Sequence, residues 1–107
     1  MPEYRIRAVV FKEGDWWVAQ CLEYNYVAIS RTLEALPEEL LRMVTAQIIV
    51  SLENGVQPFY GYSPAPRRFW EMFDRACAPV GAIEPVPLPF EGVDLDVRPT
   101  IEARLAA

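Results

Sequence analysis

Three carboxylates near the C-terminus are the residues of this sequence whose spacing could support chemistry. Asp94 and Asp96 alternate with apolar residues in the stretch from Val93 to Val97, so in an extended strand both carboxylates would point the same way. Together with Glu91 they could hold a divalent cation, because Mg²⁺ and Ca²⁺ prefer oxygen ligands. A strand face exposed to water explains the same pattern more simply. We favour that interpretation and expect neither a metal nor another cofactor.

Other residue types give little support to catalysis. The chain has no histidine, which removes the usual general base at neutral pH and the commonest zinc ligand. Cys21 and Cys77 lie far apart, without the spacing of a metal site, and Cys21 falls in a predicted strand where a buried thiol would stay neutral. We interpret both as reduced thiols, since a disulfide between them would require an oxidising compartment. We therefore predict that the protein is not an enzyme.

Composition indicates one folded domain of 107 residues. Hydrophobic residues make up 52% of the chain, which suits a packed core. The net charge of −5 argues against binding to nucleic acid and favours a basic partner. We expect no leader peptide, because no charged-then-apolar segment opens the sequence, and the longest uncharged apolar-rich run, from Met43 to Leu52, is too short to span a bilayer. We expect a cytoplasmic protein without membrane contact.

Arginines stand beside candidate partners in two places. Arg67 and Arg68 precede Phe69 and Trp70, a combination that could stack on bases, although exposed arginines on a helix with buried aromatics are the simpler interpretation. In the first strand, a pair of arginines at positions 5 and 7 shares one face. This pair could meet an acidic surface or form an ion pair with Glu23 across a hairpin.

The first third of the chain predicts a three-stranded antiparallel sheet. Residues 4–11 alternate with a period of two, and residues 13–15 supply a turn in which Gly14 can adopt a positive φ. Residues 16–23 form the return strand, and a third strand is expected near residues 26–30. On the return strand, Ala19 and Cys21 share a face with Trp17, so a helix could lie close to the sheet there. We interpret the tryptophans as packing residues.

The stretch from Pro37 to Asn54 predicts the main helix. Proline suits the first turn, two glutamates follow at the positive end of the helix dipole, and Gly55 stops the helix. A broad apolar arc should face the sheet: Leu40, Leu41, Val44, Ile48, Ile49 and Leu52. A second stripe on roughly the opposite side consists of Met43, Ala46 and Val50. This stripe should meet the C-terminal half of the chain or another subunit, so we expect a homo-oligomer.

Composition changes after residue 57, because eight of the ten prolines lie in residues 58–107. A short helix is expected after Pro66, with Phe69, Trp70 and Phe73 on one side as further candidate contact residues. The proline run at 85, 87 and 89 should form an edge strand or a polyproline-like arm, and residues 93–105 could add one or two short strands. We divide the chain into a core at residues 1–57 and an extension at residues 58–107. The extension should pack on the same domain or on a neighbouring subunit.

The N-terminal half resembles the HicB-like antitoxin family. Residues 17–21, WVAQC, are similar to the family's hairpin pattern of an aromatic residue followed by V-A-x-C/V. Residues 30–34, SRTLE, are similar to the G-D-T-L-E segment that leads into its helix, with Ser30 and Arg31 in place of Gly and Asp. The resemblance covers residues 4–55. It implies an α+β fold with a degenerate ribonuclease-H-like sheet that lacks catalytic carboxylates and carries one main helix on one face.

The same resemblance implies a function. Family members bind and mask HicA, a small basic toxin ribonuclease, and commonly form dimers or tetramers. They usually add a helix-turn-helix or ribbon-helix-helix, and residues 56–107 show no such module. We therefore expect a stand-alone, non-enzymatic, homo-oligomeric protein-binding module, with toxin neutralisation as one specific form of that role. Two alternatives stay open: a metal-dependent nuclease or hydrolase using Glu91, Asp94 and Asp96, and a structural oligomer with a docking C-terminal arm.

Overall fold

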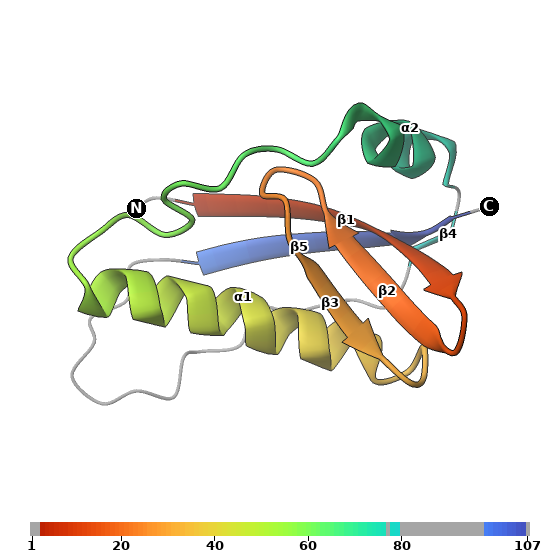
Figure 1. Cartoon of the computed structure of the whole chain (residues 1–107), viewed down its shortest axis with the longest axis horizontal. Helices are drawn as coiled ribbons and strands as arrows, with labels where there is room; N and C mark the ends of the chain where they lie inside the picture. Colours follow the sequence, from red (N-terminus) through yellow and green to blue (C-terminus); the bar gives the residue numbers. More distant parts are fainter. Residues whose placement is uncertain (1–2, 77, 80–97, 107) are drawn as a thin grey trace.

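The computed structural model of the protein describes residues 3–76, 78–79 and 98–106. The helices and strands are, in chain order, β1 (Glu3–Glu13), β2 (Trp16–Cys21), β3 (Val27–Ser30), α1 (Leu36–Glu53), α2 (Arg67–Arg75), β4 (Ala78–Pro79) and β5 (Arg98–Leu105). The strands form one sheet in the order β3-β2-β1-β5-β4, and the helices lie on its two faces (Figure 1). The protein is thus a small α+β fold.

The sheet is mixed, whereas the sequence predicted an antiparallel one. The predicted hairpin and third strand are confirmed, with Gly14 at a φ of +60° in the turn, but β5 runs parallel to β1. Parallel neighbours require a long crossover connection, and here α1 and α2 both lie between the two strands in the chain. The alternation of residues in the hairpin does not indicate that a distant strand will pair with β1.

The C-terminal strand is part of the main sheet. β5 lies between β1 and the two-residue strand β4, so residues 98–105 and 3–10 form one continuous ladder. Two described parts of residues 58–107, α2 and β5, therefore pack on the same chain. The proline run from Pro85 to Pro89 lies outside the described residues.

Alternating side chains of the hairpin create two cores, one on each face of the sheet. On the α1 face, small residues lie beneath the helix, and all are fully buried: Ala8, Ala19, Cys21 and Ala28. Leu40, Val44 and Ile48 of α1 pack against them, as the sequence predicted. On the other face, Val9 and Leu22 pack against Phe73 of α2.

The apolar stripe predicted on the far side of α1 is narrower than expected. Met43 is half-buried against the same core that Leu40 enters, because a spacing of three residues places the two side chains only about 60° apart around the helix. Ala46 and Val50 are exposed, and Val50 is 54% accessible. In the part of the chain that the structure describes, no helix has both the length and the apolar character needed to cross a membrane.

An aromatic cluster closes one end of the α1-side core. Phe59, in the loop after α1, is buried and stacks on Tyr24 with a centroid separation of 4.1 Å and on Tyr26 at 5.8 Å. Its φ is +62°, a conformation that is unfavourable for a residue with a side chain. The surrounding rings hold it there, since aromatic packing offsets the local strain.

The close contact between α1 and the sheet leads to a test of the small residues. We predict that Ala19→Leu lowers the free energy of unfolding by about 1–3 kcal/mol, because the larger side chain has no space beneath α1. The matched variant Ala46→Leu, on the exposed side of the same helix, should change it by no more than about 0.5 kcal/mol. Urea unfolding measures both values. Equal stabilities would show that α1 does not lie close to the sheet.

Candidate interaction surface

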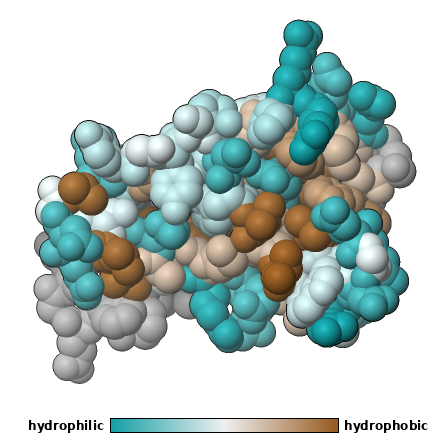
Figure 2. All heavy atoms as spheres, in the orientation of Figure 1, coloured by the Kyte–Doolittle hydropathy of each residue, from teal (hydrophilic) through white to brown (hydrophobic). Residues whose placement is uncertain are grey.

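The sheet face opposite α1 is only partly covered by α2. The helix lies over β1, where Phe69 stacks on Phe11 with a centroid separation of 6.1 Å, and it leaves the side chains of Trp16, Val27 and Ile29 accessible. We call these three side chains, together with the buried Val18 beside them, the apolar β2–β3 face. The ladder places Val18 directly beside Ile29, so the set is contiguous across the two strands. Figure 2 shows hydrophobic side chains gathered over β2 and β3 in the middle of the molecule.

Three members of this face are well exposed to solvent. Trp16 is 39% accessible, Val27 is 41% and Ile29 is 49%. Their side chains point away from α1 because Ala28, between Val27 and Ile29, belongs to the core beneath that helix. Contiguous exposed apolar groups of this kind are typical of sites that bind another molecule.

β3 also has an open edge. It is the outermost strand of the sheet. Cys21 N–H donates to the Tyr26 carbonyl at 3.0 Å, and this bond determines which residues of β3 direct their backbone groups toward β2. Every second residue of β3 therefore turns its backbone groups toward β2, and those of Val27 and Ile29 point outward. No described residue pairs with this outer edge. The strand is short, at four residues, but it has neither a charge nor a proline, two of the devices that protect a sheet edge from pairing.

Acidic side chains flank one end of the face. The register that pairs Trp17 with Ser30 brings the β1–β2 turn and the end of β3 to the same side of the sheet. Glu13 ends β1 just before that turn, Asp15 lies in the turn, and Glu34 lies in the loop after β3. All three are exposed and form no ion pair with a described residue. Charges that attract a basic partner are therefore available beside the apolar surface.

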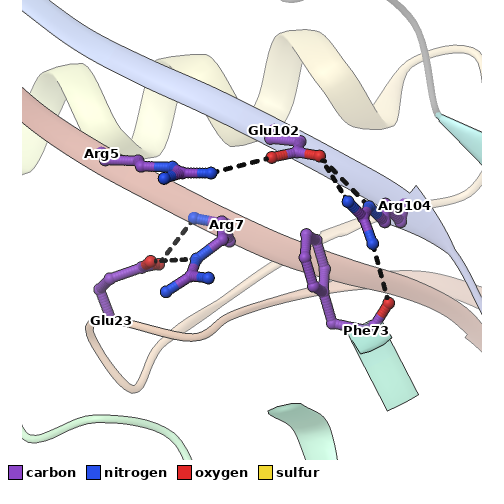
Figure 3. A network of polar contacts seen from close by, with 6 residues as sticks. All are labelled: Arg5, Arg7, Glu23, Phe73, Glu102 and Arg104. Atoms are coloured by element: carbon purple, nitrogen blue, oxygen red, sulfur yellow. Dashed lines mark hydrogen bonds and ion pairs between the residues drawn. The ribbon is translucent and has the colours of Figure 1, made fainter. Parts of the chain in front are cut away.

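The cations on this side of the molecule are already engaged. Arg31 lies 4.1 Å over the ring of Trp16. Arg7 donates from its backbone N–H and its Nε to Glu23, at 2.7 and 2.6 Å (Figure 3). Its guanidinium lies over the ring of Trp70. The predicted pairing across the hairpin with Glu23 is thus confirmed for Arg7.

The remaining arginines of the network join β5 to α2 and to β1. Arg104 of β5 donates to Glu102 at 3.0 and 3.2 Å and to the carbonyl of Phe73 at 3.5 Å, and it lies over the Phe73 ring (Figure 3). Arg5 reaches the other oxygen of Glu102 at 3.6 Å. These contacts fasten α2 over β1 and β5, which keeps it away from β2 and β3.

The arginines of α2 follow the simpler sequence interpretation. Arg67 forms an ion pair with Glu71 at 3.3 Å on the outside of the helix, and Arg68 lies over the Phe69 ring. Phe69 and Trp70 are half-buried against the sheet, and Trp70 Nε1 donates to the Ala65 carbonyl. The aromatics are therefore packing residues that present no row of rings for stacking on bases.

The most reactive residue type in the described chain is chemically quiet. Cys21 is a free thiol, fully buried beneath α1, and burial raises its pKa to about 12. Burial also raises the pKa of Tyr26. Neither group ionises near neutral pH. Within residues 3–76, 78–79 and 98–106, no cluster of acidic or cysteine side chains could hold a metal ion.

The sequence-based candidate residues have different positions in the fold. Phe73 is buried in the α2-side core with Phe69 and Trp70 at its margin, and Met43 packs in the other core. Ala46 and Val50 remain on the surface. The candidate metal ligands Glu91, Asp94 and Asp96 lie outside the described residues. The three exposed residues of the β2–β3 face were not among the sequence-based candidates, although the run Val27-Ala28-Ile29 is apolar on both faces of a predicted strand.

Comparisons with known proteins add no relative. No protein-family model matches the chain, and no curated protein or solved structure is significantly similar to it. The candidate surface therefore depends on the geometry described above.

Burial of Cys21 leads to a pH-dependence prediction. Its pKa is about 12 in the folded chain and near 9 when unfolded, so only the unfolded state loses this proton at moderately alkaline pH. We expect stability to be unaffected by this thiol below pH 9 and to fall by up to about 1.4 kcal/mol per pH unit above it. Urea unfolding at pH 8 and pH 10 measures the change.

Cys21→Ala provides the control for this prediction. The variant should show a smaller loss between pH 8 and pH 10, because the ionising thiol is gone. Tyr26→Phe should keep the loss over this range, since an unfolded tyrosine ionises only near pH 10. The same decrease in wild type and Cys21→Ala would contradict the assignment.

Proposed function

We propose that this protein is a HicB-like, non-enzymatic protein-binding module whose apolar β2–β3 face binds a small basic protein. The observation that carries the proposal is a contiguous exposed apolar surface with unpaired carboxylates beside it. Protein interfaces combine an apolar centre with a polar rim, and tryptophan is among the residues that contribute most to binding energy. Trp16 is the tryptophan of this surface, and it is 39% accessible.

The charges beside the face suggest the chemistry of the partner. Glu13, Asp15 and Glu34 are exposed without ion-pair partners among the described residues, whereas nearby Arg31 is already stacked on Trp16. A basic protein would gain electrostatic steering toward this end of the sheet. An acidic partner or a nucleic acid would meet repulsion from the same carboxylates.

The order of the elements supports the HicB-like part of the proposal. Residues 3–53 form three strands followed by one helix on one face, the arrangement that the resemblance in WVAQC and SRTLE implies. A HicA-type toxin ribonuclease is a small basic protein, so it has the charge that the surface would attract. We place the module in the cytoplasm as part of the same proposal, because a free thiol such as that of Cys21 stays reduced there.

A binding titration tests this function. We expect the purified chain to bind a HicA-type ribonuclease of its own genome in isothermal titration calorimetry, more weakly as the salt concentration rises. Trp16→Ala should weaken binding at least about tenfold, because it removes the largest side chain of the face. The matched variant Tyr60→Ala, which truncates a 78% exposed aromatic residue elsewhere, should bind like the wild type.

Two results would overturn the proposal. One is a folded wild-type chain that binds no such ribonuclease. The other is an equal affinity for wild type and Trp16→Ala, which would place the contact on another surface. Circular dichroism of both variants verifies that the substitutions leave the fold intact.

A further inference from the structure

We infer that the outer edge of β3 pairs with β3 of a second copy of this chain, antiparallel and with Ala28 on the two-fold axis. The inference goes beyond the proposed function, which concerns the side-chain face of β2 and β3. The edge is formed instead by the backbone groups of Val27 and Ile29 that point away from β2. It is complementary to itself in hydrogen bonding, in side-chain size and in charge.

In this register, the outward backbone groups of β3 in the two copies would form hydrogen bonds with each other. A two-fold axis through Ala28 places Val27 of one copy opposite Ile29 of the other. In an antiparallel ladder, such an outward-facing pair exchanges both of its N–H···O=C hydrogen bonds, and the symmetry repeats the pair. The groups left open at the edge in one copy therefore all find partners in two copies. Shifting the register by one residue would place Val27 and Ile29 opposite residues whose backbone groups are already used by β2.

The side chains at the junction also fit. Ala28 meets its symmetry mate at a non-hydrogen-bonded position, where the two Cα atoms lie only about 4.5 Å apart and small side chains are favoured. Its methyl group is fully buried beneath α1 and does not point toward the second copy. On the opposite face, Val27 and Ile29 of the two copies form cross-strand apolar pairs, and these are the side chains that are 41% and 49% exposed in one copy.

The side chains next to the edge place no like charges together when a second copy occupies it. β3 itself has no charged side chain, and the nearest one, Arg31, would lie opposite Asn25 of the other copy in this register. The two Arg31 side chains then lie at opposite ends of the junction. No like charges meet at the junction in this register, and β3 has no charge or proline to oppose pairing. The second copy also places two apolar β2–β3 faces side by side in one sheet.

Mass in solution tests the pairing. We expect multi-angle light scattering to give twice the 12.2 kDa mass of one chain for the wild type. Ile29→Lys introduces an edge charge, and Ile29→Pro removes an outward N–H that the single chain does not use. Each should raise the dimer dissociation constant at least about tenfold. Val50→Lys, at an equally exposed aliphatic residue on α1, should leave the dimer unchanged.

Cysteine cross-linking tests the register. A mixture of Val27→Cys and Ile29→Cys chains should form an interchain disulfide, because hydrogen-bonded pairs have Cα atoms about 5.5 Å apart, within disulfide range. Neither variant alone should cross-link, since like positions lie diagonally, about 7–8 Å apart. The wild type, oxidised in parallel, controls for the native thiols.

Several outcomes would overturn the inference. These are a monomeric wild type at 100 µM, a dimer that Val50→Lys dissociates and Ile29→Lys does not, and a dimer without a cross-link in the mixed sample. The result is separable from the binding function, because Trp16→Ala should remain dimeric while losing affinity for the basic protein. A dimer that binds no basic protein would reject only the proposed function.

Discussion

Ala8, Ala19, Cys21 and Ala28 form a layer of small, fully buried side chains on which α1 rests, and the arrangement of the molecule depends on this contact. Small residues allow the helix to approach the sheet closely, so its large aliphatic side chains fill the space that the sheet leaves. The same contact explains the quiet chemistry of Cys21, since a thiol in this position is excluded from water and stays protonated. A packing requirement therefore accounts for the cysteine at this position.

The second core explains why part of the sheet is left open. α2 is short and is held over β1 and β5 by Phe69, by Phe73 and by the interactions of Arg7 and Arg104 with it. It therefore covers Val9 and Leu22 and does not extend over β3. Apolar residues on both faces of β3 would be sufficient for a strand buried between two helices. In the single chain only the α1 face of β3 is covered. The side chains on its other face are apolar but exposed, and this identifies the candidate surface.

Local patterns predicted the elements that local forces determine. The period of two in residues 4–11, the turn at Gly14 and the helix after Pro37 were all identified, because each depends on neighbours a few residues away. The parallel position of β5 could not be predicted, since it depends on a crossover of the whole chain. Nor could the exposure of Val27 and Ile29, because it depends on where α2 packs. The exposed stripe was predicted too wide because Met43 lies at the margin of the buried arc of α1, where helical spacing alone does not decide the outcome.

The open edge and the open face of β3 use different groups of the same residues. The edge presents the N–H and C=O groups of Val27 and Ile29, whereas the face presents their side chains together with Trp16. Self-pairing would satisfy the backbone groups and leave the outer surface of the side chains accessible, so a dimer and a bound partner are compatible. The carboxylates of Glu13 and Asp15 lie at the turn between β1 and β2, outside the two-fold junction. A chain with these properties can assemble through its backbone and select its partner through side chains and charge.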